Sequence, residues 1–477
     1  MKSNFESSFE TNDEKILFNL ASKSFLSVWS YSNLYRDQGD STNGGAGKEF
    51  CDFTAIFGND VLLFSDKRIE YKNSHEENVA WNRWHKKAVV SSANQLRGAE
   101  RWLLRYPNRI FLDKRCTERL QIPLGENPKI HKVVVTHGLE DVLKSRSGES
   151  SFSYTSSEDY RKEFWIRQKD YIPGDIVHVF TGDTLAFLMN HIDTTRDFVE
   201  YLIERECVFT CDVDIFVFKE SDLVHMYYKT VKNGDKTQRQ ELVQNGAPVC
   251  TFHHGISALL QDHVFHEKRR ADWISYFWDG LIENISHHIV QGTAEGPGVK
   301  NLSQSEIVLR RLADFSRFER RIMSDNFWNM WLSVPPKCRG NRVVKEMGNV
   351  LYVFVLIPEE NFQNNEQYRN FRRHLLCEYI CIYGLEFRSY KEVVGIAAKT
   401  REEKEVNEIT PLIIKQLLLA GVDYAWWDNS CWTDEDIRNT VIARDELISE
   451  NLLNSPEHRT ETHRRSHEFK DGSSVSD

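Results

Sequence analysis

The chain has 477 residues, of which 40% are hydrophobic and 28% are charged, and this balance predicts a globular protein of two or three domains. No apolar run approaches the roughly 18 residues that are needed to cross a bilayer, so we expect no membrane-spanning segment. The formal net charge of −10 disfavours a surface coated for nucleic acid, although a local basic channel on an acidic protein remains compatible with it.

The N-terminal segment and the cysteines bear on location. The first 15 residues are polar and acidic, unlike a signal or transit peptide. The nine cysteines show no paired framework, and their odd number argues against a secreted protein built on disulfides. We therefore expect a cytoplasmic protein.

The first predicted helix runs from about Glu14 to Ser30, after a segment at residues 1–11 that we expect to be disordered. Glu14 lies in the first turn of this helix, where a carboxylate commonly complements the helix dipole. A loop rich in glycine and serine follows at residues 36–48.

The stretch from Gly47 to Arg68 predicts a tight β-hairpin. Asp52 opens one apolar run, Gly58-Asn59-Asp60 supplies turn residues, and a second apolar run leads to Lys67. Because strand side chains alternate between faces, Lys67 shares one side of its strand with Ser65. A carboxylate at the start of one strand can therefore lie beside a lysine at the end of its neighbour, an arrangement suited to holding Mg²⁺ and a phosphate.

A long helix is predicted next, from about Val79 to Arg105, with Gln95 among the residues that recur at three- and four-residue steps. Lys129 to Thr136 then reads as a buried strand. The order of elements is thus helix, hairpin, helix, strand.

This order, with Asp52 and Lys67 on the two hairpin strands, resembles the PD-(D/E)XK nucleases of restriction-endonuclease-like fold, and most of all the nuclease-related domain. The resemblance covers about residues 12–140. Asp52 matches the family's Asp and Lys67 its Lys. Ser65 stands two residues before the lysine, where the family usually has the acid that is the second metal ligand. Asp66 is a nearby acid that alternation turns away from Lys67.

The resemblance implies a catalytic site with Mg²⁺ or Mn²⁺ as its cofactor. Asp52 would hold the metal together with Glu14 or Glu49. Lys67 would stabilise the charge that develops on the phosphate, and Gln95 would position the attacking water. Glu14 matches an acid that the family often carries on its first helix.

The rest of the chain predicts further mixed α/β structure. We expect an α/β middle region at residues 160–245, a helical and α/β C-terminal region at 248–450, and a disordered tail at 451–477. The predicted fold class is mixed α/β, with an N-terminal restriction-endonuclease-like domain and a larger α/β C-terminal part.

Within the C-terminal region, strands are expected at 349–358 and 391–399, and helices at about 365–383 and 411–420. The stretch from Arg310 to Arg321 carries five arginines on a helix that either faces phosphates or forms a solvated face.

Two functions remain open at this point. The resemblance implies a metal-dependent endonuclease acting on nucleic acid, DNA in the first instance, and it is compatible with a role in bacterial defence against foreign DNA. The alternative is a catalytically inactive nuclease-like domain that serves as a binding or assembly module, which Ser65 and the acidic net charge favour. In either case we expect the C-terminal region to recognise the target or a protein partner, and no membrane.

Overall fold

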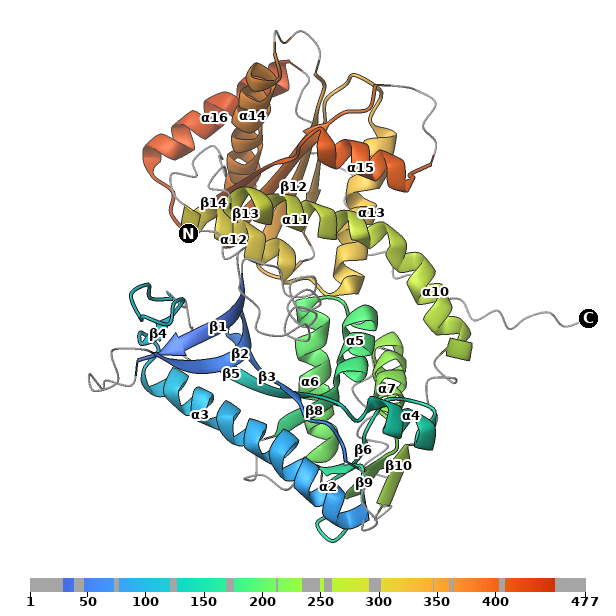
Figure 1. Cartoon of the computed structure of the whole chain (residues 1–477). Helices are drawn as coiled ribbons and strands as arrows, with labels where there is room; N and C mark the ends of the chain where they lie inside the picture. Colours follow the sequence, from blue (N-terminus) through green and yellow to red (C-terminus); the bar gives the residue numbers. More distant parts are fainter. Residues whose placement is uncertain are drawn as a thin grey trace, which may run out of the picture. The chain divides into compact units, whose positions relative to one another are not determined.

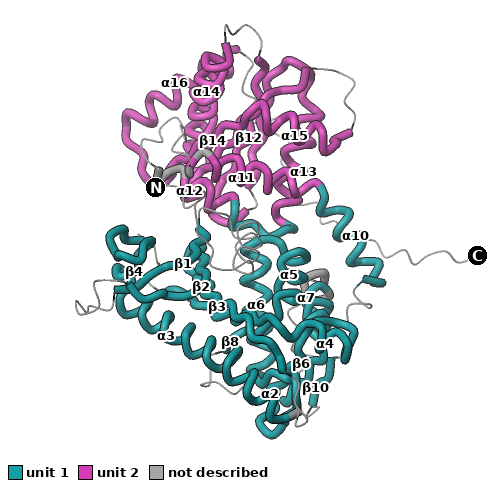
Figure 2. Tube along the Cα trace, viewed as in Figure 1, with its two compact units in different colours: residues 1–273, 313–318 teal, residues 274–312, 319–477 magenta. Residues whose placement is uncertain are grey.

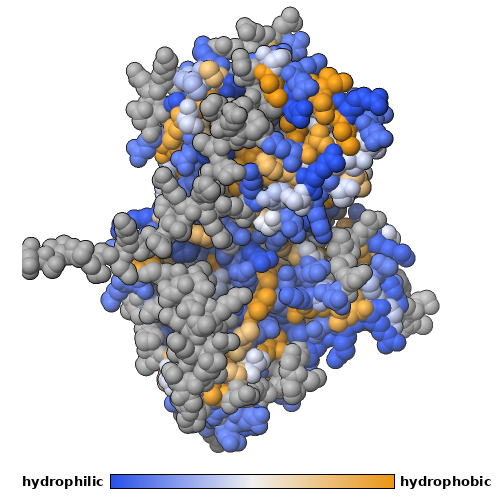
Figure 3. Space-filling view, turned by 180° about the vertical axis from the view of Figure 1, so that it is seen from behind, coloured by the Kyte–Doolittle hydropathy of each residue, from blue (hydrophilic) through white to orange (hydrophobic). Residues whose placement is uncertain are grey.

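The computed structural model describes residues 29–37, 47–72, 77–120, 127–168, 176–211, 213–233, 249–252, 260–290, 302–345, 347–359, 362, 364–402 and 408–450. The chain divides into two compact units, shown in Figure 2: unit 1 is Met1–Trp273 with Ala313–Phe318, and unit 2 is Ile274–Leu312 with Glu319–Asp477. No helix within the described ranges is both long and apolar enough to cross a bilayer. Seen from behind, the described surface is mainly hydrophilic with smaller hydrophobic areas (Figure 3).

The main sheet of unit 1 has, in the described part of the chain, the strand order β4-β1-β2-β3-β5-β8. Its strands are β1 Ser30–Arg36, β2 Lys48–Phe57, β3 Asp60–Arg68, β4 Ile110–Phe111, β5 Lys129–His137 and β8 Val177–Thr181. Strands β4, β1, β2 and β3 pair antiparallel, whereas β5 is parallel to β3 and β8 is parallel to β5. The sheet that begins in the first 140 residues therefore continues to β8.

Helices cover both faces of this sheet (Figure 1). They are α2 Glu77–His85, the π-helical turn η3 Lys86–Val90 and α3 Ser91–Arg105 on one face, and α5 Gly182–His191 and α6 Thr195–Phe209 on the other. On the first face, Lys132 Nζ of β5 lies 2.9 Å from Glu100 Oε1 of α3. On the second, His178 Nε2 of β8 lies 3.0 Å from Glu206 Oε1 of α6.

A smaller sheet completes unit 1, with the order β10-β9-β6-β7. Its strands are β6 Ser153–Thr155, β7 Trp165–Arg167, β9 Asp214–Val217 and β10 Val249–Phe252. The other helices of unit 1 in the described part of the chain are α4 Glu140–Ser147, α7 Glu220–Asn233 and α10 His263–Asp272. One hydrophobic core is shared by both sheets. Tyr154 of β6 joins them directly, because its hydroxyl donates to the carbonyl of Val179 in β8 at 3.0 Å.

Unit 2 is built on a sheet with the order β11-β12-β13-β14. The strands are β11 Gly340–Val344, β12 Val350–Ile357, β13 Glu392–Lys399 and β14 Asp423–Asp428, and only the β12–β13 pair among these described strands is parallel. The helices that its described residues form are α11 Tyr276–Val290 after the short η4 Trp273–Ser275, α12 Leu302–Ala313, α13 Arg317–Ser333, α14 Asn365–Glu386, α15 Pro411–Leu419 and α16 Asp434–Ser449.

The two faces of the unit 2 sheet carry different helices (Figure 1). Helix α14 packs closely on one face because Gly395 of β13 has no side chain, and a Cβ there would lie 2.5 Å from Ile380. On the opposite face, Phe354 of β12 contacts Trp278 of α11 and Phe327 of α13, with ring centroids 6.2 and 5.6 Å apart. Helix α15 contacts α11 and so belongs to this second face.

The predicted fold class, mixed α/β, is confirmed. The predicted strands at 349–358 and 391–399 correspond to β12 and β13, and the two helices that follow them correspond to α14 and α15. The long helix predicted from Val79 to Arg105 is also present, interrupted by the π-helical turn.

Two details of the prediction are wrong. Ser30 is not the end of a helix, because it begins β1 and pairs with Ala55. The alternating pattern from Cys207 to Lys219 predicts a strand or a pair of strands, but the stretch starts as helix, because α6 continues to Phe209 before β9 begins at Asp214. Residues 14–28 of the first predicted helix, the N-terminal segment 1–11 and the tail 451–477 lie outside the described residues.

Candidate functional site

The β2–β3 hairpin places Asp52 opposite Ser65. Its turn begins at Gly58, whose φ of +57° is a conformation that residues with a Cβ adopt rarely. The ladder pairs Phe57 with Asp60 at the turn and ends with Phe53 and Phe64. Continuing this register by one residue brings Asp52 and Ser65 to the same face, as cross-strand neighbours are.

The side chain of Asp52 accepts a hydrogen bond from the backbone of β3 just beyond the last pair of the β2–β3 ladder. The backbone N–H of Asp66 donates to Asp52 Oδ2 at 2.5 Å. Burial raises the pKa of Asp52 to about 7; the Asp66 N–H and the Ser65 hydroxyl act against this rise, while the carboxylates of Glu49 and Asp66 add to it. The ionised form of Asp52 is therefore poorly compensated by its described neighbours, and a cation placed beside it would stabilise that form.

Lys67 lies two residues beyond Ser65 and points to the same side of β3 by strand alternation. That side of β3 faces α3. Leu63 of β3 points to the same side and pairs with Lys132 of β5, whose ammonium forms an ion pair with Glu100 of α3. Within the described ranges, Lys67 makes no hydrogen bond or ion pair. None of the described residues therefore occupies its ammonium, which can bind an anionic group such as a phosphate.

Glu49 approaches Asp52 through a β-bulge. Leu34 of β1 pairs with Cys51, but the next residue, Tyr35, pairs with Glu49, so Phe50 is an extra residue in β2. A bulge shifts the alternation by one residue and turns Glu49 towards the side of Asp52. Its contribution to the raised pKa of Asp52 agrees with this placement. Glu49 itself is exposed.

The other two predicted site residues are less closely connected. Gln95 is half-buried on α3, and it forms no hydrogen bond with Asp52 or Lys67, although all three residues are described. Its predicted role in positioning water stays a prediction. Glu14 lies outside the described residues.

On the opposite face of β3, Asp66 meets a histidine that the sequence did not point to. The Asp66 side chain is only 3% exposed, and His137 Nε2 at the end of β5 lies 2.8 Å from its Oδ1. The other ring nitrogen of His137, Nδ1, lies 3.3 Å from Glu140 Oε1. Burial opposes ionisation of Glu140, but contacts with His137 and with backbone N–H groups outweigh it and lower the pKa of Glu140. His137 is thus held between two carboxylates.

Two glycines make room for this cluster. Gly138 has a φ of +94°, and its N–H donates to Glu140 Oε2 at 2.7 Å. Gly182, the first residue of α5, lies so close to His137 that a Cβ there would come within 2.3 Å of the ring. The signal that points to the cluster is topological: Asp66, His137 and Gly182 lie at the carboxyl ends of three adjacent parallel strands.

The arginine-rich stretch forms parts of two helices, and four of its arginines are paired with carboxylates. These pairs are Arg310 with Glu306 at 2.6 Å, Arg311 with Glu392 at 2.5 Å, Arg317 with Asp193 at 2.9 Å and Arg320 with Asp279 at 2.6 Å. Charges that are neutralised inside the protein offer little to phosphates. This arrangement favours a structural role for the stretch over a phosphate-facing one.

The described residues contain no group of three or more histidine, cysteine or acidic side chains placed to share one metal ion. Comparison with known proteins gives no family. No family model, curated protein or solved structure matches the chain. The geometry of the hairpin site therefore has to carry the functional argument on its own.

Proposed function

We propose that unit 1 hydrolyses phosphodiester bonds in nucleic acid, with DNA as the substrate, at a metal-assisted site on the β2–β3 hairpin. The observation that carries the proposal is Asp52, a half-buried carboxylate with a pKa raised to about 7, next to the strand that bears Lys67. The topology supports it as well. The β2–β3 hairpin, the helices α2 and α3 and the strand β5 follow one another in the order hairpin, helix, strand, which is part of the order that resembles the PD-(D/E)XK nucleases.

The residues fit Mg²⁺ or Mn²⁺ in donor chemistry. Asp52 and Glu49 supply carboxylate oxygens, the donors that these cations prefer, and burial, which raises the pKa of Asp52, disfavours an ionised carboxylate that has no cation beside it. Mg²⁺ commonly takes only one or two protein carboxylates and completes its shell with water and substrate phosphate. The shortage of a third protein ligand among the described residues is therefore compatible with the proposal.

Bound there, the cation would polarise the scissile phosphate and activate a water molecule. Lys67 would bind a non-bridging phosphate oxygen and stabilise the charge that accumulates on it, because its ammonium has no described partner of its own. Asp52 would be fixed for this task by the N–H of Asp66, which holds one carboxylate oxygen in place.

A second function is favoured by a specific observation. Ser65 is fully buried opposite Asp52, at the position where an acid would supply a second ligand. With Ser65 there, the domain would bind nucleic acid or a protein partner without cutting, and the charged groups of the hairpin would serve recognition alone. In both functions, the rest of the chain would contribute the surface that binds the target or a protein partner.

Cleavage assays separate the two functions. Purified full-length protein is incubated with supercoiled plasmid, single-stranded DNA and RNA, in the presence of Mg²⁺, Mn²⁺ or a chelator. The proposal expects cleavage of plasmid that requires the metal and is lost in Asp52→Asn. Asp141→Asn, which removes an exposed acid on α4, is the matched control and should cut like the wild type. Binding without cleavage under every metal condition would favour the inactive module.

A further inference from the structure

A second candidate site lies in unit 2, at the carboxyl ends of the parallel strands β12 and β13. These strands run in register from Val350 with Glu392 to Ile357 with Lys399, so both end at the same edge of the sheet. From that edge the chain leaves β12 towards α14 on one face and leaves β13 towards α15 on the other. A crevice outside strands whose connections diverge in this way is a common ligand position in α/β sheets.

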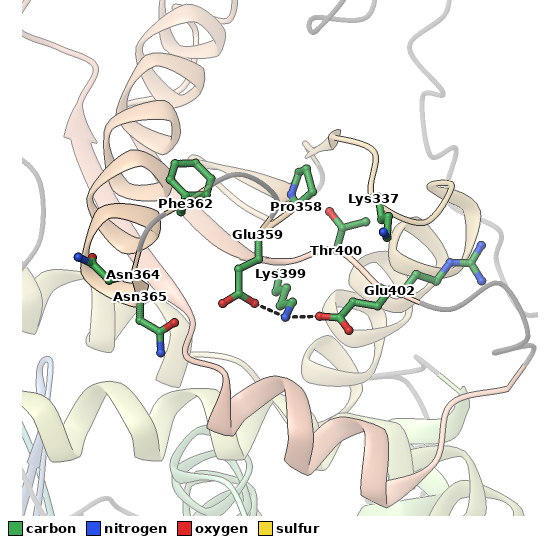
Figure 4. A pocket seen from close by; sticks show the side chains of 10 residues that line it. Lys337, Pro358, Glu359, Phe362, Asn364, Asn365, Lys399, Thr400 and Glu402 are labelled. Atoms are coloured by element: carbon green, nitrogen blue, oxygen red, sulfur yellow. Dashed lines mark hydrogen bonds and ion pairs between the residues drawn. The ribbon is translucent and has the colours of Figure 1, made fainter.

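A cavity of about 420 Å³ occupies this position, and Figure 4 shows the side chains that line it. Its charged residues are Lys337, Lys399 and Arg401 against Glu359 and Glu402. Three cations against two acids leave the lining with a net positive charge. The volume lies within the range of about 300–1,000 Å³ that is typical of sites for small molecules.

Lys399 is the central cation. Its ammonium forms ion pairs with Glu359 and, at 2.5 Å, with Glu402, as the dashed lines in Figure 4 show. Burial would lower the pKa of Lys399, but the two carboxylates outweigh it and raise that pKa. The Glu402 side chain is 65% exposed, so it is a surface group that can swing away when another anion reaches Lys399.

The other walls complete a site for an organic anion. Asn364 caps α14 by accepting the N–H of Gln367 at 2.9 Å, which places the positive end of a long helix dipole at the cavity. Phe362 also lines the cavity, and its ring packs against Tyr368 and Phe371, with centroids 5.4 and 5.2 Å away. A supported aromatic ring beside cations suits a flat ring that carries a phosphate.

We propose that this cavity binds a small phosphate-bearing ligand of mononucleotide size, with its phosphate on Lys399. The phosphate takes the place of Glu402 as the anionic partner of the ammonium, and the flat ring lies against Phe362. The proposal concerns unit 2 alone and is independent of catalysis at the hairpin. It assigns this half of the chain a ligand that the hairpin site does not require.

Titration calorimetry on the full-length protein tests the proposal, with adenosine 5′-monophosphate, adenosine and inorganic phosphate as probes. We expect the monophosphate to bind and adenosine to bind about tenfold more weakly or not at all, because the charge-assisted contact with Lys399 is lost. Inorganic phosphate distinguishes a nucleotide from free phosphate as the ligand. If it binds more weakly than the monophosphate, a nucleotide is supported, whereas equal binding overturns the role given to Phe362.

Three variants are expected to differ in how tightly they bind the monophosphate. Lys399→Met should weaken monophosphate binding by about tenfold. Glu402→Gln should strengthen it, because it removes the competing anion at an exposed position where folding is little affected. Lys391→Met, at the other end of β13 and exposed, is the matched control and should bind like the wild type.

Whether Glu402→Gln strengthens or weakens monophosphate binding tests the proposal even if Lys399→Met fails to fold. Weaker or unchanged monophosphate binding in a folded Glu402→Gln variant would overturn the proposal. The absence of binding by every phosphate-bearing probe to the wild type would overturn it as well.

Discussion

The backbone N–H of Asp66 donates a hydrogen bond to Oδ2 of Asp52 across the β2–β3 hairpin, at 2.5 Å. This contact links the two faces of the sheet. The carboxylate of Asp52 lies on the α3 side with Ser65, while the side chain of Asp66 lies on the other side against His137. The position of the proposed metal ligand is thus coupled to a buried cluster that does not itself face the site.

The raised pKa of Asp52 predicts a pH-dependent cost of folding. Since the ordinary value of 3.8 rises to about 7 in the folded protein, the folded state binds the proton more tightly between these values. Stability should therefore fall as pH rises from about 4 to about 7. Asp52→Asn removes this term, so above pH 7 it should be more stable than the wild type by on the order of 1–2 kcal/mol.

Denaturant unfolding at a series of pH values measures this difference. Added Mg²⁺ should stabilise the wild type above pH 7 and leave Asp52→Asn unchanged, because only the carboxylate attracts the cation. Identical pH profiles for the two proteins would show that the folded protein does not disfavour the ionised form of Asp52, and they would contradict this prediction.

Ser65→Glu tests the departure from the acid that the resemblance implies at this position. Ser65 is fully buried, so the larger charged side chain should cost about 1–3 kcal/mol of stability. If Ser65 limits metal binding, the variant should bind Mn²⁺ more tightly than both the wild type and Ser65→Ala in calorimetric titration. A folded variant with weaker binding would mean that the serine has a role of its own or that another acid already fills the space.

Gly182→Ala tests the rigidity of the His137 cluster. The added Cβ would come within 2.3 Å of the imidazole, which contacts with Asp66 and Glu140 hold in place, so we expect a loss of about 1–3 kcal/mol. Gly98→Ala on α3 is the control, because a Cβ there meets nothing within 4 Å. Thermal unfolding should show the control equal to or more stable than the wild type. Equal behaviour of both variants would mean that His137 moves aside easily.

The hairpin could be predicted from the sequence because its information is local. Turn residues, two apolar runs and alternation are enough to place Asp52 beside the strand of Lys67. Strand β1 was missed because SYSNLYR has only Ser30 and Leu34 buried, and it offers no continuous apolar pattern.

The two sites that the sequence did not reveal depend on contacts between distant segments. His137 meets Asp66 because β5 lies beside β3, and their positions in the sequence are 71 residues apart. Lys399 meets Glu359 only because β12 and β13 end at the same edge. Neither pairing leaves a periodic signal in either segment alone, so topology has to be known first.

A comparison of fragments tests how the chain divides its work. Strand β8 pairs with β5 and the core of unit 1 extends from Leu34 to Phe265, so a fragment of residues 1–145 should expose a strand edge and aggregate. A fragment of residues 1–273 should be more soluble and should retain metal-dependent cleavage, with less discrimination among nucleic acids than the full chain. Equal discrimination by this fragment would show that unit 2 does not select the substrate.

The most direct test of the proposed function is nicking of supercoiled plasmid by Lys67→Ala. Lys67 has no described partner to lose, so the variant should fold like the wild type. Lys129→Ala, at the exposed start of β5, removes an equal charge from the opposite end of the sheet and should keep the wild-type rate. We predict Mg²⁺-dependent nicking by the wild type and by Lys129→Ala, and a loss of at least about a hundredfold in Lys67→Ala. Nicking by Lys67→Ala at the wild-type rate would contradict the assignment of this hairpin as the catalytic site.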